Sequence, residues 1–327
     1  MGLGAEPGGV TRDRWAVVAA IALALTATIS GVRTGYREMD VDEVVYVHTL
    51  HSMQHHEGYY EAMRDALVKK EGAPPSAARA IRPPPLYLIL RWFPERSWRW
   101  LAGLAFLASL LLVARLGRPF GTYGGLVAVV LAGLWLVASA PLLFLHGEIW
   151  GLPLLIGALL YVRRDDDWRA VACVVGAVLF RELYAVMLGI GFLLRRRRVP
   201  WLVGLVVVAA LAAVHVALAA HVLSKTGHQV RLGNDPRTLG FVLRAMGLGD
   251  RPTISWLAIP IFAAAVTGAT RVRTTDAAAR LILPFAAVMF AAAVYATRIY
   301  WTLTFAPALA AWAPAAFSRA AAPHSMP

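Results

Sequence analysis

Cysteine and lysine are scarce in this chain, and long polar stretches are confined to two places. The single cysteine, Cys173, excludes an intramolecular disulfide and a zinc site built from thiolates. Apolar runs recur from Trp15 to Phe317 and leave no stretch for a separate soluble core. We therefore expect an all-α polytopic membrane protein, with residues 1–327 forming one transmembrane domain and no separate soluble domain.

The charge is strongly one-sided, with 32 Lys and Arg against 19 Asp and Glu. A net charge of +13 is also found in nucleic-acid-binding proteins. Here the arginines cluster between apolar spans and not among aromatic residues on a solvated face, so we expect no nucleic-acid partner. The abundance of Ala, Arg, Gly and Val beside three lysines is typical of a GC-rich bacterial genome.

Apolar residues make up 59% of the chain, and the mean hydropathy is +0.60. The apolar run from Trp15 is long enough to span a bilayer, so we interpret it as a retained first helix and not as a cleaved signal peptide. The pattern predicts about ten transmembrane helices. Their expected ranges are 15–33, 98–116, 121–140, 142–162, 168–180, 182–194, 200–222, 253–271, 279–296 and 300–317.

The basic turns indicate an orientation, because short cytoplasmic loops are enriched in Lys and Arg. With both termini cytoplasmic, the short outer turns contain only Arg181 and Arg298. The predicted localisation is the plasma (inner) membrane, multi-pass. The basic residues of the inner turns are Arg12, Arg14, Arg115, Arg118, Arg163, Arg164, Arg195 to Arg198, Arg271, Arg273 and Arg319.

Residues 168–194 allow two interpretations. One long helix would bury Arg181 and Glu182 near its middle and would reverse every later span. Two half-length helices that meet at a polar turn keep both flanking basic clusters inside and bury no ion pair in hydrocarbon. We favour two short helices, which must line a water-filled cavity or a locally thin membrane.

Two outer loops are expected, at about 34–97 and 223–252. The first contains an amphipathic helix to about His56, a proline run from Arg82, and the segment PLYLILRWF. That segment suits a helix in the membrane interface, with Trp92 and Trp98 at the level of the headgroups. The second loop suits a mobile cover over a site.

Three acids, Asp40, Asp42 and Glu43, directly follow the first span. One of them can cap a helix N-terminus. Three acids in four residues exceed what a cap needs, and a carboxylate here can serve as the base that activates a hydroxyl nucleophile.

Three histidines, His48, His51 and His55, share one face of a helix. Three imidazoles on one stripe are weak candidates for a divalent-metal site, and a solvated, histidine-rich face is the favoured alternative.

Other polar residues lie at helix ends on the outer side. His146 and Glu148 begin the fourth span in FLHGEIWG, and a charged side chain there usually faces the interior of the bundle. Snorkelling to the headgroups is the competing account. Arg181 and Glu182 in FRELY form either a local ion pair or, because arginine stays charged and binds with two donors, an anchor for a phosphate.

The chain resembles the GT-C membrane glycosyltransferases, which include lipid A aminoarabinose transferases and protein O-mannosyltransferases. The resemblance covers most of the chain. It rests on DEVVYVHTLHSMQHHEGYYEAM at 42–63, on RPPPLYLIL at 82–90, and on the short motifs GEIWG, FRELY and RIYWTLTFAPAL.

The resemblance implies transfer of a hexose or pentose from a polyprenyl-phosphate donor on the outer face of the membrane, with inversion at the anomeric carbon. The expected acceptor is a cell-envelope glycan, lipid or protein. The family's catalytic Asp falls on Asp42, with Asp40 and Glu43 as neighbours. Donor-phosphate binding falls on Arg298, Arg181 and Arg82, and substrate binding on Glu148, His146, Glu182 and Tyr46. Some members use a divalent metal and others none.

Three rival interpretations remain. A polymerase that uses the same lipid carrier would make a processive product. A flippase or transporter would carry charge near the membrane midplane or gates on both faces. A catalytically inactive scaffold would have the same fold but no transfer activity.

Overall fold

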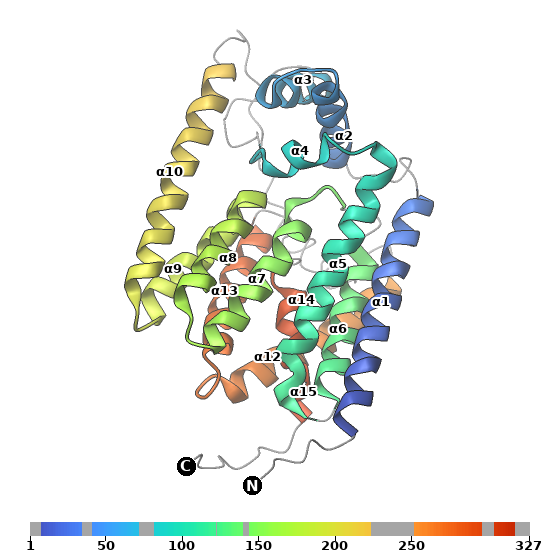
Figure 1. The fold of residues 1–327 in the computed structure, drawn as a ribbon, viewed down its shortest axis with the longest axis vertical. Helices are drawn as coiled ribbons and strands as arrows, with labels where there is room; N and C mark the ends of the chain where they lie inside the picture. The colour runs from blue at the N-terminus through green and yellow to red at the C-terminus, as the bar shows by residue number, and fades with distance from the viewer. Residues whose placement is uncertain are drawn as a thin grey trace.

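The computed structural model describes residues 8–34, 41–71, 82–121, 123–139, 144–223, 252–295 and 304–317. Throughout these ranges the chain is helical or in turns, and they contain no strand, which confirms the all-α prediction. Figure 1 shows the long helices packed side by side, with the short helices α2, α3 and α4 covering one end.

Each predicted span up to 279–296 coincides with a helix. The long apolar runs are interrupted only at Gly, Pro and charged turns, and these interruptions separate one helix from the next. The tenth is broken into short helices around two prolines. The helices are α1 (Gly8–Thr34), α5 (Glu95–Gly117), α6 (Gly124–Ser139), α7 (Gly147–Arg163), α8 (Asp167–Phe180), α9 (Ala185–Leu194), α10 (Arg198–Leu223), α12 (Pro252–Val272), α13 (Ala277–Tyr295), α14 (Ala306–Leu309) and α15 (Ala313–Phe317).

Within the described ranges, two helical segments are long and apolar enough to cross a membrane by length and composition, Glu95–Phe120 and Arg198–Leu223. Shorter apolar helices accompany them, including Arg14–Ser30 and Ala277–Ala292. The described residues therefore do not confirm ten transmembrane helices.

The cap is formed by α2 (Val41–Gln54), α3 (Tyr59–Glu71) and α4 (Pro85–Leu90). Helix α2 ends slightly before the predicted limit, and His56 in the following turn has a φ of 74°. The expectation for Trp98 was wrong, because this side chain is fully buried and its Nε1 donates to the carbonyls of Leu90 and Phe93, 3.0 Å away in each case. Trp98 thus ties α4 to α5, while Trp92 is 75% exposed.

The chain reverses direction between α8 and α9, as predicted. The backbone of Arg181 is extended, and a 3-10 turn at Glu182–Tyr184 leads into α9. Arg195 at the end of α9 donates from Nε to Oδ1 of Asp167 at the start of α8, at 2.8 Å. Trp201 of α10 donates to the same oxygen at 3.1 Å. The two half-length helices therefore form a hairpin, which we call the α8–α9 hairpin, and its tip is the Arg181–Tyr184 turn.

The opposite end from the cap is held by ion pairs, and we call it the basic end. Arg163 at the end of α7 contacts Asp276 before α13, with Nη2 2.6 Å from Oδ2. Asp276 also accepts from Trp312 Nε1 at 2.9 Å and from the backbone N–H of Ala278. These contacts bring the turns after α7, α9 and α12 to one end, as the basic clusters predicted.

Removal of Asp276 tests how firmly this end is held. We expect Asp276→Ala to lower the free energy of unfolding by about 3 kcal/mol, because it leaves Arg163 partly buried without its carboxylate. Thermal or denaturant unfolding in detergent micelles measures the change. The control is Asp65→Ala in α3, whose side chain is 52% exposed beside Arg64 and should matter by less than about 1 kcal/mol. Equal losses in the two variants would contradict this assignment.

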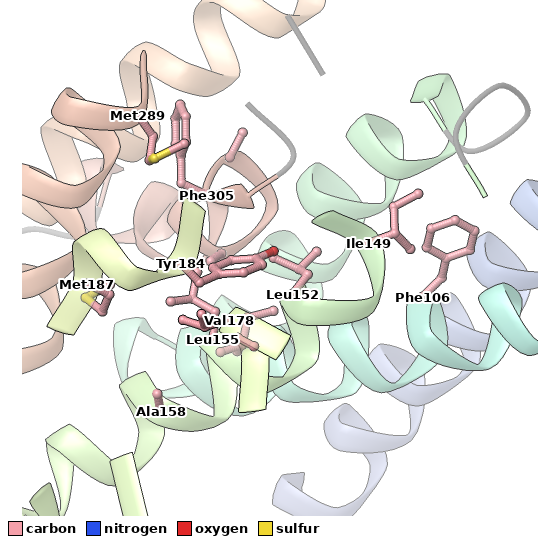
Figure 2. Packing of buried hydrophobic residues seen from close by; sticks show 14 of the residues in the cluster. Phe106, Ile149, Leu152, Leu155, Ala158, Val178, Tyr184, Met187, Met289 and Phe305 are labelled. Carbon is pink, nitrogen blue, oxygen red and sulfur yellow. The ribbon is translucent and has the colours of Figure 1, made fainter. Parts of the chain in front are cut away.

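A packed core lies beneath the hairpin tip. Figure 2 shows the ring of Tyr184 beside Leu152 of α7, with Leu155 and Val178 next to it. The hydroxyl of Tyr184 donates to the carbonyl of Glu148 at 2.5 Å. Gly151 allows this approach, since a Cβ there would lie 2.2 Å from the Tyr184 ring. The core thus fixes the tip against the first turn of α7.

Candidate functional site

Polar side chains gather where the hairpin tip and the start of α7 meet the cap. We call this group the polar cluster. Helix α2 contributes one member, the segment before α4 another, and the start of α7 and the hairpin tip the rest. The members are Tyr46, Arg82, His146, Glu148, Arg181 and Glu182.

The centre of the polar cluster is a buried ion pair. Arg181 Nε lies 2.7 Å from Glu148 Oε1, and the two side chains are 3% and 0% exposed. Within the described residues, no other residue forms a hydrogen bond of good geometry with either oxygen of Glu148, or with Nε and Nη2 of Arg181. Buried charged groups lose several kcal/mol when such bonds are missing. The pair is therefore suited to accept a further polar group.

A close approach of two backbone segments brings this ion pair together. Gly147 begins α7, and a Cβ at this position would lie 2.0 Å from the carbonyl oxygen of Phe180. The contact allows the last residue of α8 to rest on the first turn of α7, so that Arg181 meets Glu148.

A second ion pair shares the same arginine. Glu182 Oε1 lies 3.3 Å from Arg82 Nη1 and 3.6 Å from Arg181 Nη1. The Glu182 side chain is 49% exposed, so this half of the polar cluster is open to its surroundings. Two guanidinium groups thus flank one carboxylate, one from the cap side and one from the hairpin tip.

The cap holds Arg82 in place through tyrosines. Tyr46 Oη accepts from Arg82 Nε at 3.3 Å, and Tyr59 Oη donates to the Arg82 carbonyl at 2.5 Å. Burial, followed by the neighbouring Tyr46 and Tyr60, raises the pKa of Tyr59 well above its usual value, so this hydroxyl keeps its proton as a donor. Tyr59 also packs on Tyr87, with ring centroids 5.3 Å apart.

His146 lies beside the buried pair. Its Nδ1 is 3.8 Å from Glu148 Oε2, and its side chain is 2% exposed. The ring meets the ring of Tyr46 edge-on, with centroids 5.5 Å apart. An imidazole, a carboxylate and a phenol therefore line one wall of the polar cluster.

The structure brings together six residues that the sequence analysis proposed for substrate or phosphate binding. Asp40 and Arg298 lie outside the described residues, as do the side chains of Asp42 and Glu43. The backbone of Asp42 is in the first turn of α2, one turn before Tyr46.

Around the histidine stripe, as elsewhere in the described residues, no group of three or more His, Cys, Asp or Glu is set to hold an ion. His51 pairs instead with Glu95, with Nε2 2.7 Å from Oε2. His55 follows the end of α2 and is exposed.

One polar contact was not anticipated. His215 of α10 lies 3.1 Å from Tyr60 Oη of α3 through Nδ1, and the rings are 5.7 Å apart. His215 is also close enough to Glu182 to interact electrostatically. The sequence signal for His215 was its position as an ionisable residue inside a long apolar run. Such residues are rare in membrane spans unless they have a role.

A methyl group at Gly147 should disturb the polar cluster. We expect Gly147→Ala to lower the free energy of unfolding by about 1–3 kcal/mol and to separate Arg181 from Glu148, since the Phe180 carbonyl must move. Thermal unfolding measures the first effect. The control is Gly189→Ala in α9, where a Cβ meets nothing within 4 Å. The control should be neutral or stabilising by up to about 1 kcal/mol, so a similar loss there would refute the close-approach argument.

Comparison with protein-family models, with curated proteins and with solved structures finds no match for this chain.

Proposed function

We propose that the chain is an integral membrane glycosyltransferase of the GT-C type. It moves a sugar from a polyprenyl-phosphate donor to an acceptor hydroxyl on the outer face of the membrane. The observation that carries the proposal is the convergence of two arginines and two acids from distant parts of the chain in one cluster, at the end away from the basic turns.

The proposed arrangement in the membrane follows from this separation. The basic end faces the cytoplasm of a multi-pass protein, and the cap lies on the extracytoplasmic side. Helix α8 rises by about 20 Å from Asp167 to Phe180, and a hydrocarbon core is about 30 Å thick. The polar cluster then lies in the outer leaflet region, beneath the cap.

Arg82 and Arg181 are the proposed donor-phosphate ligands, with Arg298 as a further candidate. The developing charge on a departing polyprenyl phosphate needs fixed cations. Arg181 is held by the core beneath the hairpin tip, and its Nη2 has no hydrogen-bond partner among the described residues. Arg82 is held by Tyr46 and Tyr59. Both are therefore pre-oriented, which strengthens electrostatic stabilisation of the leaving group.

The remaining groups suit the sugar and the acceptor. Asp42, with Asp40 as the alternative, accepts the proton of the acceptor hydroxyl as its oxygen bonds to the anomeric carbon. The bond from that carbon to the phosphate oxygen breaks on the opposite face, and polyprenyl phosphate leaves with the electron pair. Glu148, His146, Glu182 and Tyr46 supply donors and acceptors for sugar hydroxyls.

A transport function is less well supported by the described residues. A transporter needs a path that opens at both ends. At the basic end, Asp276 binds Arg163 and Trp312, and Asp167 binds Arg195 and Trp201. These contacts join the turns and favour a site that opens on one side.

The test is a transfer assay in proteoliposomes that also contain cell-envelope extract as the acceptor source. Polyprenyl phosphates carrying a labelled hexose or pentose serve as donors. We expect a labelled product together with release of polyprenyl phosphate. A ladder of products indicates a polymerase, whereas movement of intact donor across the bilayer without cleavage indicates a flippase and rejects the proposal.

A further inference from the structure

Helix α10 is packed at its two ends but not in its middle. Near its start, Trp201 is buried, and a Cβ at Gly204 would lie 2.7 Å from Val171 and 3.0 Å from Leu188. Near its end, Ala219, Val222 and Leu223 are buried. All residues from 209 to 214 are exposed. Since successive residues turn by about 100°, this stretch is exposed on every side.

The exposure includes the face that looks toward the bundle. Gly204 and Ala219 mark this face because both are buried. Leu211 and Ala212 follow Gly204 at helical spacing and fall on the same face, yet Leu211 is 43% exposed. No described residue covers them. We call this uncovered stretch of the inward face the α10 window.

The window opens at the height of the polar cluster. Trp201 and Asp167 are hydrogen-bonded, so α8 and α10 are level there, and both then rise in the same direction. The stretch from Asp167 to Arg181 is as long as the stretch from Trp201 to His215, so Arg181 and His215 lie at the same height. The interaction of His215 with Glu182 agrees with this placement. Leu211 and Ala212 lie about one turn, or 5 Å, below that level.

The upper edge of the window is a defined contact. His215 and Tyr60 join α10 to the cap by the 3.1 Å hydrogen bond. The lower edge is the contact of Gly204 with α8 and α9. Between these edges the window is apolar, while the cations Arg82 and Arg181 lie beyond it.

We infer that the α10 window admits the hydrocarbon chain of a lipid phosphate, whose phosphate then meets Arg82 and Arg181. An apolar chain covers Leu211 and Ala212, and an anionic headgroup matches the buried guanidinium. A neutral apolar helix from another protein would offer no acceptor to Nη2 of Arg181, which has no hydrogen-bond partner among the described residues. The inference rests on the proposed function only for the identity of the lipid, a polyprenyl phosphate.

Photocrosslinking with a matched pair of positions tests this inference. Cys173→Ser supplies a background without native thiols. Ala212→Cys lies in the window, and Ala210→Cys replaces an alanine that is also exposed, on the opposite face of α10. Each thiol receives a benzophenone maleimide, and the protein is placed in phosphatidylcholine vesicles that contain a trace of radiolabelled polyprenyl phosphate.

We expect labelling at position 212 to be saturable. Unlabelled polyprenyl phosphate at about ten times its Kd should lower it about tenfold by mass action and should leave position 210 unchanged. Polyprenol without phosphate should compete poorly, and Arg181→Met should abolish the competition. Labelling that is equal and unaffected by competitor at the two positions would overturn the inference. If polyprenol lowers the labelling as well as polyprenyl phosphate does, the proposed role of the arginines is wrong.

The same preparations separate this inference from the proposed function. Saturable labelling without any sugar transfer leaves the window in place and rejects the glycosyltransferase. Sugar transfer without saturable labelling at position 212 rejects the window alone.

Discussion

Arg181→Met is expected to lower the free energy of unfolding by about 3–5 kcal/mol, because it leaves the Glu148 carboxylate buried without a cation. Sugar transfer should fall by at least about 100-fold, since the leaving phosphate loses a fixed donor. Thermal unfolding in detergent and the transfer assay measure the two effects. Arg164→Met changes an exposed arginine at the basic end and should affect neither.

A double variant separates stability from activity. Arg181→Met with Glu148→Leu replaces the buried pair by apolar groups and should recover most of the lost stability. Transfer should stay lost. If the double variant regains both, the pair has a structural role only, and the assignment of Arg181 to the phosphate is wrong.

Asp42→Asn is expected to reduce sugar transfer by about 100-fold to 10,000-fold, because an amide cannot take the proton of the acceptor hydroxyl. Saturable labelling of Ala212→Cys by polyprenyl phosphate should persist, since the phosphate is held by the arginines. Asp40→Asn, made separately, decides between the two neighbouring acids. The control is Glu57→Gln in the exposed turn after α2. Unchanged product with both Asp variants rejects the mechanism.

The helices were predictable because each depends on a long apolar run with charged or proline-rich ends. The break at Arg181 was also predictable, since one continuous helix would have buried an ion pair in hydrocarbon. The contact of Arg195 with Asp167 directly supports this break, because it places the end of α9 beside the start of α8. Whether each helix crosses a membrane does not follow from apolar runs alone, and in the described part of the chain two segments are long and apolar enough to do so.

The sequence analysis expected Arg82, Glu148 and Arg181 on the same side of the membrane and therefore near one another. It did not predict which residues would form ion pairs. Arg82 meets Glu182 across 100 positions of the chain, and this contact depends on how the cap settles on the hairpin tip. The prediction for Trp98 failed for a similar reason: two carbonyls inside the fold satisfy its indole N–H, which then has no need of the interface. His215 was missed because its partners, Tyr60 and Glu182, are distant in sequence.

The half-length hairpin has a consequence for biogenesis. At 14 and 10 residues, α8 and α9 are each shorter than the roughly 20 residues that a transmembrane helix needs. Their closing contact joins Arg195 to Asp167, and Trp201, which is synthesised only as α10 begins, donates to the same carboxylate oxygen. We expect truncation of the nascent chain before residue 201 to remove this second hydrogen bond and to make α8 and α9 more accessible to proteases.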